Sequence, residues 1–109
     1  MKHFFRIDEI GRERERAGKG KLYQEFLRVP AMSAGVYVLA AGGTDPQKPH
    51  REDEMYYVLR GRARMKIGSE DGEVSAGSVI FVEAEADHRF YDIEEELEVL
   101  VFFAPAEQE

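Results

Sequence analysis

Residues 42–61 read GGTDPQKPHREDEMYYVLRG, and this stretch decides the predicted fold. Turn-forming residues come first, and a run of apolar and aromatic residues leads to Gly61. Side chains alternate between the two faces of a strand, so His50, Glu54 and Val58 share one face. If Val58 faces the interior of the domain, His50 and Glu54 face the same interior. Two side chains that bind metals, aimed at one cavity, make half of a candidate metal site.

Residues 77–92 read GSVIFVEAEADHRFYD and supply the other half. His88 follows a turn and opens a predicted strand, in which it shares a face with Phe90. Because Phe90 is an expected interior residue, we expect His88 to point inward. Together with His50 and Glu54 it forms a set of two imidazoles and one carboxylate, which leaves open coordination positions on a metal. Open positions admit water or substrate and are typical of catalytic sites rather than structural ones.

From residue 22 onward the chain consists of short runs rich in β-branched and aromatic residues, most of them separated by Gly, Pro, Asp or Ser. This spacing predicts an all-β sandwich or closed barrel rather than alternating strands and helices. The predicted strands cover residues 23–29, 35–40, 55–60, 62–67, 78–82, 88–93 and 98–104.

Two turns stand out between these strands. Gly61 separates two strand-like runs, so we expect a tight hairpin corner with a positive φ angle. Residues 67–72 are typical of a longer hairpin loop. Residues 55–59 and 99–103 are apolar at both parities, which predicts burial of both faces. One face of each would fill the barrel and the other would meet a second subunit, so we expect a homodimer.

The N-terminal segment has a different texture. Residues 8–20 are highly charged and could form a short helix, but they carry too little apolar surface to be a core element. We therefore expect a solvated arm or loop. The chain is therefore interpreted as an N-terminal arm, residues 1–21, followed by one barrel domain, residues 22–109.

The bulk composition excludes several classes of protein. The 109 residues suffice for one domain, and 43% hydrophobic residues favour a packed globule. A net charge of −7 argues against nucleic acid or an anionic membrane as the main partner. No stretch is long and apolar enough to span a bilayer, the N-terminus lacks the apolar core of a signal peptide, and there is no cysteine. These features predict a soluble, cytoplasmic protein.

The two quoted segments resemble the two signature motifs of the cupin superfamily. The first motif is Gly, five residues, His-x-His, three or four residues, Glu, six residues and Gly, matched here by Gly42, Lys48, His50, Glu54 and Gly61. The second is Gly, five residues, Pro-x-Gly, two residues, His, three residues and Asn. Gly77 and His88 match it, with Glu83, Glu85 and Asp92 in the Pro, Gly and Asn places. Fifteen residues separate the two motifs, and the resemblance covers residues 35–104.

The resemblance implies a conserved six-stranded β-barrel of the double-stranded β-helix or jelly-roll type, often dimeric. It also implies a divalent metal ion (Fe, Mn, Zn or Ni) at the positions of Lys48, His50, Glu54 and His88. Lys48 departs from the family, because a protonated ammonium has no lone pair to offer and repels a cation. Three ligands remain, His50, Glu54 and His88, or four if Gln47, Tyr56 or a water takes the missing position.

The side chains around this set have ordinary alternatives. Glu54 could be a surface carboxylate beside Glu52 and Asp53, but its parity with Tyr56 favours the interior. Lys48 either swings out to solvent, which we expect, or anchors an anionic substrate at the barrel mouth. A pocket could be lined by aromatic residues that are more often core, namely Tyr37, Tyr56, Phe81, Phe90 and Phe102.

Two functions follow as hypotheses. The first is a metal-dependent enzyme acting on a small molecule, such as a dioxygenase, an isomerase or a lyase, with Tyr56 or Lys48 orienting the substrate. The second is a non-catalytic module that binds a small molecule, as sensor cupins do. A barrel kept only for oligomer assembly is the plainest alternative. The sequence names neither the substrate nor the metal, because one scaffold hosts many chemistries.

Overall fold

The computed structural model describes residues 1–18 and 20–108 as one α-helix and six β-strands. Lys19 and Glu109, which fall within the predicted arm and the predicted barrel, lie outside the described residues. The elements follow one another as α1 (Ile7–Arg16), β1 (Tyr23–Val29), β2 (Met32–Leu39), β3 (Asp53–Ile67), β4 (Glu70–Ser75), β5 (Val79–Val82) and β6 (His88–Ala104).

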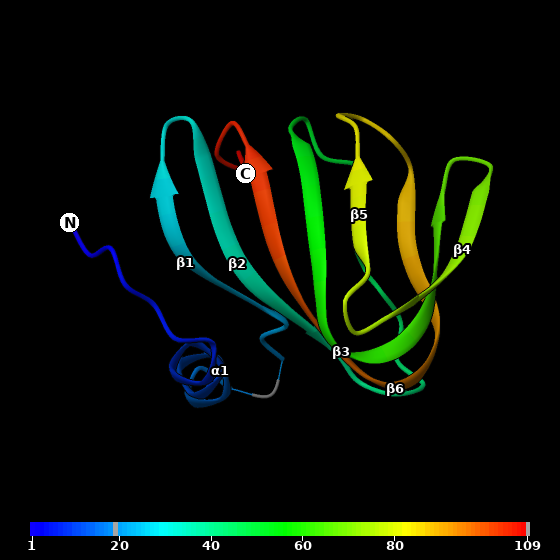
Figure 1. Ribbon diagram of the computed structural model, residues 1–109, viewed down its shortest axis with the longest axis horizontal. Coiled ribbons are helices and arrows are strands. Elements are labelled where there is room, and N and C mark those ends of the chain that lie inside the picture. The colour runs from blue at the N-terminus through cyan, green and yellow to red at the C-terminus, as the bar shows by residue number, and fades with distance from the viewer. Residues whose placement is uncertain (19, 109) are drawn as a thin grey trace.

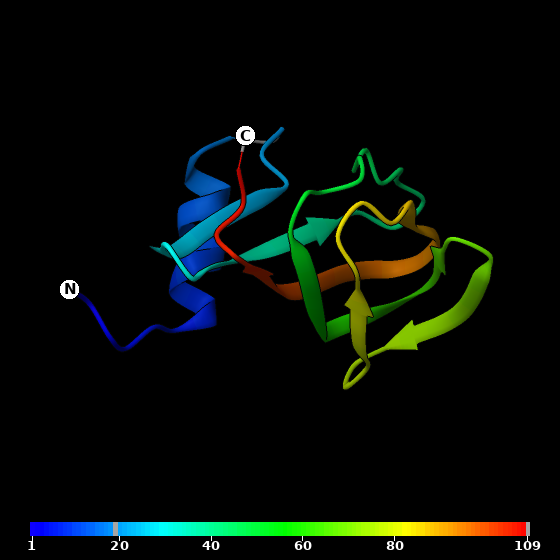
Figure 2. The ribbon, with the colours of Figure 1, turned by 90° about the horizontal axis from the view of Figure 1, so that it is seen from above.

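The strands form one antiparallel sheet that curls on itself. The strand order is β1-β2-β6-β3-β4, and β5 pairs with the first part of β3. The two long strands β3 and β6 run through the whole sheet and bend with it, which closes a barrel on one side of the molecule (Figures 1 and 2). The predicted all-β barrel fold is therefore confirmed.

The corner predicted at Gly61 is a bend inside one strand rather than a hairpin. Gly61 has φ +99°, as expected, but residues 55–60 and 62–67 both belong to β3. Opposite this bend, the register between β3 and β6 shifts repeatedly, as at β-bulges. The predicted strands 88–93 and 98–104 likewise merge into β6.

The sequence did not predict strand β4 as a separate element. The segment predicted as a long loop, residues 67–72, contains only a two-residue turn, and β4 begins at Glu70. Only Val74 of β4 is buried in the core. A strand with one buried apolar residue carries almost no alternating pattern, which explains why it was not predicted.

The first half of β3 alternates strictly between the barrel interior and the outer surface. Glu54, Tyr56 and Val58 are buried, whereas Met55 and Tyr57 are exposed. The parity argument for Glu54 is therefore confirmed, and the serious alternative of a surface carboxylate is wrong.

The expectation of a solvated N-terminal arm or loop is wrong for residues 7–16, which form α1. Ile10 of this helix is buried and packs with Val36 and Val38 on the outer face of β2. Figure 2 shows α1 lying beside β1 and β2, away from the barrel. Phe5 and Ile7 pack against the same apolar cluster and enlarge the contact between the helix and the sheet. Within the described residues, no helix has the length and apolar content needed to cross a membrane.

The bend at Gly61 predicts a specific cost for a side chain there. A methyl group at this position would overlap the carbonyl oxygen of Glu96, and the φ angle is one that L-residues rarely adopt. We therefore expect Gly61→Ala to lower the free energy of unfolding by about 2–4 kcal/mol. Urea denaturation measures this, with Gly72→Ala as the control, because Gly72 has open space around it. Equal stabilities for the two variants would contradict the account of the bend.

Candidate metal site

The three predicted ligands meet inside the barrel. One donor atom from each of His50, Glu54 and His88 lies within 4.8 Å of the others. Nε2 of His88 is 3.2 Å from Oε1 of Glu54, and Nε2 of His50 is 4.0 Å from the same oxygen. Donors about 2.1 Å from a shared ion lie up to about 4.2 Å apart. Small rotations of the three side chains would therefore bring their donor atoms to bonding distance from one shared ion.

The curled sheet explains how residues so far apart in sequence meet. Glu54 pairs with Val82 at the end of β5, and the turn that follows β5 delivers His88 at the start of β6. His50 lies in the loop before β3 rather than on a strand, so the period-two argument does not apply to it directly. Instead, the backbone N–H of Glu85 donates to the carbonyl of His50 at 2.6 Å and ties the two loops together.

Glu85 occupies the Gly place of the second motif and adopts the backbone that a glycine would. Its φ angle is +69°, in the left-handed region. A left-handed residue therefore stands where the second motif has glycine, and His88 still points into the barrel.

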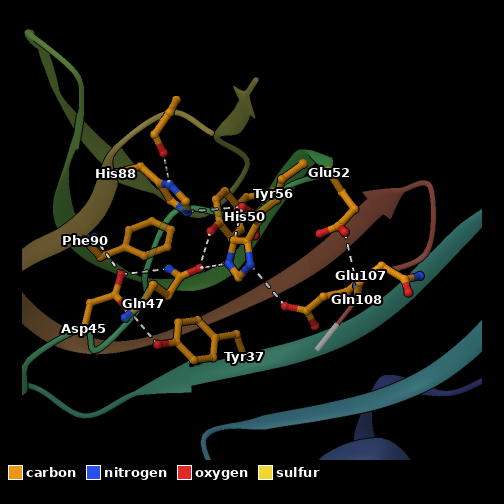
Figure 3. Close-up of polar contacts among 12 residues, drawn as sticks. Tyr37, Asp45, Gln47, His50, Glu52, Tyr56, His88, Phe90, Glu107 and Gln108 are labelled. Atoms are coloured by element: carbon orange, nitrogen blue, oxygen red, sulfur yellow. Dashed lines mark hydrogen bonds and ion pairs between the residues drawn. The ribbon is translucent and has the colours of Figure 1, made fainter. Parts of the chain in front are cut away.

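The ring of His88 is oriented by its own turn. Nδ1 lies 2.8 Å from the carbonyl oxygen of Ala86, so it carries a proton and leaves Nε2 facing Glu54 (Figure 3). Burial lowers the pKa of His88, but the carboxylate of Glu54 and the carbonyl of Ala86 together outweigh burial, and the pKa is raised.

The ring of His50 is oriented by Glu107, which sequence reasoning missed. Nδ1 of His50 lies 3.2 Å from Oε2 of Glu107, so Nε2 of this ring also faces Glu54. The contact with Glu107 is the main reason why the pKa of His50 is raised. Glu107 itself is held by a bond from its backbone N–H to Oγ of the buried Ser33, at 3.0 Å. A carboxylate that fixes the tautomer of a ligating histidine is a recurrent feature of metal sites.

The inward-facing atoms of this cluster have unmet bonding capacity. Among the described residues, neither oxygen of Glu54 nor Nε2 of His88 has a hydrogen-bond partner, although all three atoms are buried. Buried polar groups in folded proteins are nearly always bonded. A buried carboxylate facing two imidazole nitrogens is a donor set that suits a divalent cation, so the residues present fit the ion that the two motifs imply.

A second buried carboxylate, Asp45, organises the wall of the site and was not predicted. It accepts hydrogen bonds from Tyr37 Oη at 2.7 Å, from the backbone N–H of Phe90 at 2.9 Å, and from Nε2 and the backbone N–H of Gln47 at 2.8 and 3.1 Å. With its amide fixed in this way, Gln47 turns Oε1 inward, where it accepts the hydroxyl of Tyr56 at 2.8 Å. The same oxygen lies 3.4 Å from Nε2 of His50.

Gln47 rather than Lys48 therefore faces the metal-ligand cluster. Lys48 is exposed to solvent, as expected, and lies at the rim of the barrel mouth. Phe90 is buried with its ring 5.1 Å from that of Tyr56, so it supports the site from the core. Phe81 does not line the interior, because it is exposed on the outer face of β5.

A cavity of about 150 Å³ opens beside the cluster. Its wall includes His50, Glu54 and Glu107 together with apolar and aromatic side chains from β1, β2 and β6, namely Tyr23, Tyr37, Val101 and Phe103. The cavity therefore borders the cluster of His50 and Glu54.

Comparison with known proteins establishes the family. Residues 35–103 match the family model for the cupin domain. The chain is also 50% identical, over 103 residues, to the uncharacterized protein SCO3923 of Streptomyces coelicolor; the match covers 94% of this chain and 96% of that protein. The chain therefore belongs to the cupin family.

Solved structures agree on the fold. A cupin 2 conserved barrel domain protein from Rhodopseudomonas palustris superposes with a TM-score of 0.70 at 19% identity, over 80% of this chain and 62% of that one. The DMSP lyase DddQ from Ruegeria pomeroyi superposes with a TM-score of 0.68 at 18% identity, over 78% of this chain and 48% of that one. The chain thus spans less than two thirds of either protein, and at these identities the likeness concerns the fold alone.

The hydrogen bonds of Asp45 predict that the site wall depends on this carboxylate. Replacing it by alanine leaves the Tyr37 hydroxyl and the Phe90 amide without an acceptor in a buried region. We expect Asp45→Ala to lower the free energy of unfolding by about 2–4 kcal/mol. Chemical denaturation measures the change, and Glu70→Ala, which removes an exposed carboxylate, serves as the control. A loss below about 0.5 kcal/mol, as at ordinary surface sites, would show that the network is not structural.

Proposed function

We propose that this protein is a metal-binding cupin in which His50, Glu54 and His88 hold one divalent ion, and that the ion binds a small molecule in the adjoining cavity. The observation that carries the proposal is the group of buried atoms without hydrogen-bond partners, two on Glu54 and one on His88. A buried carboxylate that accepts no hydrogen bond is costly unless a positive charge neutralises it, as a bound cation would.

Each residue has a defined task in this proposal. Glu107 and the carbonyl of Ala86 hold the two imidazoles so that both Nε2 atoms face Glu54. Gln47, fixed by Asp45, offers an amide oxygen on the side that Lys48 leaves open. Three protein ligands leave coordination positions for water or a substrate oxygen.

A bound ion of this kind supplies Lewis-acid chemistry, or redox chemistry if it is iron. The apolar wall formed by Val101 and Phe103 excludes water from that side of the site. The proposed reaction class is therefore a transformation of a small molecule by a lyase, an isomerase or an oxygenase. A DMSP lyase shares this barrel fold, which supports the first of these at the level of fold only.

Metal binding tests the proposal directly. The metal-free protein should bind one equivalent of Mn²⁺, Co²⁺ or Zn²⁺, and the ion should raise the melting temperature because it binds only the folded state. His88→Ala should weaken binding by at least about 100-fold, more than the loss of a residue that merely orients a ligand. Calorimetric titration measures both proteins.

The control for this experiment is His3→Ala, because His3 is exposed near the N-terminus. It should bind the ion as the unaltered protein does. If the unaltered protein binds none of the three ions, or if His88→Ala binds them equally well, the proposed function is wrong.

The role of Glu107 yields a separate prediction. Glu107→Ala removes the partner of His50 Nδ1 but no proposed ligand. We expect ion affinity to fall by about 10- to 100-fold while the stoichiometry stays at one. Competition with a chromophoric chelator measures the affinity, with the exposed Glu83→Ala as the control. Unchanged ion affinity in Glu107→Ala would show that Glu107 does not support ion binding.

We also propose that the protein is a homodimer joined through the outer face of β3 and β5. Met55 pairs with Phe81 and Tyr57 with Val79 across these strands, and all four side chains are 41–63% exposed. On the other side of β3, the same two residues pair with Phe102 and Leu100 of β6. A continuous apolar patch of this kind on a sheet is typical of a subunit interface.

The oligomeric state tests this interface. The unaltered protein should elute with twice the chain mass of 12.5 kDa, and Phe81→Asp should shift it to the monomer because it buries a charge in the interface. Size-exclusion chromatography with light scattering measures the mass. Phe4→Asp, at an exposed residue outside the patch, should remain dimeric. A monomeric unaltered protein would rule out the proposed dimer.

A further inference from the structure

Tyr23 lines the cavity and carries a buried hydroxyl. Tyr23 belongs neither to the two motifs nor to the ligand cluster. The residue opens β1, and its ring lies edge-on to those of Tyr37 and Phe103, with centroids 6.4 Å away in each case. Its hydroxyl oxygen is buried and has no hydrogen-bond partner among the described residues. A tyrosine hydroxyl in a protein interior usually has such a partner.

The position of this ring depends on the residue beneath it. Gly35 on β2 lies directly under the ring, and a methyl group at Gly35 would overlap the ring carbon that bears the hydroxyl. Any other residue at this position would displace Tyr23. The pairing of β1 with β2, which sets Gln24 and Glu25 opposite Val36 and Gly35, therefore holds the hydroxyl in place.

Tyr23 and the ligand cluster border the same cavity. The ring of Phe103 lies 5.0 Å from that of His50 and 6.4 Å from that of Tyr23, so Tyr23 and His50 flank one apolar surface. The cavity measures about 150 Å³. A closed apolar cavity of roughly this volume accommodates benzene in another protein, so a molecule of about six non-hydrogen atoms fits the space.

We infer that Tyr23 is the hydrogen-bond donor that recognises the ligand of this site, and that the ligand is a small carboxylate or 2-oxo acid with one oxygen on the metal side and a second oxygen on Tyr23. The inference rests on the proposed function, because an ion held by Glu54 and the two histidines supplies the attraction for an anionic oxygen.

The protonation state of Tyr23 agrees with a donor role. Burial raises the pKa of its hydroxyl, and the carboxylate of Glu107 raises it further, so the group keeps its proton at neutral pH. A protonated hydroxyl can donate to a ligand acceptor, such as a carbonyl or carboxylate oxygen. A ligand with donor groups alone could bond to the lone pairs of the hydroxyl oxygen but would leave its proton without an acceptor.

The experiment uses Co²⁺, whose visible absorption reports on its ligands, and pyruvate, a 2-oxo acid of the size of benzene, as the probe. Pyruvate is titrated into the Co²⁺-loaded protein, into Tyr23→Phe and into Tyr91→Phe, the last being a tyrosine of β6 whose hydroxyl bonds to Arg64 and Asp71 away from the cavity. Tyr23→Phe should bind Co²⁺ normally but bind pyruvate about three- to tenfold more weakly, the effect of losing one hydrogen bond. Tyr91→Phe should match the unaltered protein.

Gly35→Ala provides the second variant, because it moves the hydroxyl without removing it. It should weaken pyruvate binding in the same direction, with the melting temperature recorded to show that the protein is folded. Equal pyruvate affinity in Tyr23→Phe and the unaltered protein would overturn the inference, as would a Co²⁺ spectrum that pyruvate does not change. Both results would leave the metal site intact, whereas failure of the unaltered protein to bind Co²⁺ would overturn the proposed function and this inference together.

Discussion

A charged carboxylate in the interior of a small protein is unfavourable unless a cation or several hydrogen-bond donors contact it. Glu54 is such a carboxylate in this barrel. It is 2% exposed, and its oxygens have no hydrogen bond from any described residue. The two imidazole nitrogens that face it are positioned by contacts made elsewhere, with Ala86 and Glu107. The proposed cation, shared by all three side chains, would explain this arrangement.

Asp45 is a second buried carboxylate in the same barrel, and its role is structural. It is 7% exposed, and it accepts hydrogen bonds from Tyr37, Gln47 and Phe90. The difference between the two carboxylates is therefore one of partners rather than depth. Donors saturate Asp45 and leave it inert, whereas Glu54 keeps its oxygens free beside a cavity.

The parts of this account that were predictable from sequence are those with a strong local signal. The alternation of Glu54, Tyr56 and Val58 on β3, and the spacing of the two motifs, predicted the barrel and the three ligands. The contribution of Glu107 was not predictable, because it depends on the chain after β6 returning to the barrel mouth. Asp45 lies in a loop without periodicity, and Tyr23 acquires its position only through the register of β1 on β2. The helix α1 was not favoured over a loop, because residues 8–20 are highly charged and carry little apolar surface.

The central claim is that one ion bridges two strands and a loop inside the barrel, and an anomalous-difference crystal structure measures this most directly. Crystals of protein purified without chelator and soaked in Zn²⁺ are predicted to show one peak about 2.0–2.2 Å from Nε2 of His50, a carboxylate oxygen of Glu54 and Nε2 of His88. An ion bound elsewhere, or an interior without a peak in which the carboxylate of Glu54 instead receives hydrogen bonds, would contradict it.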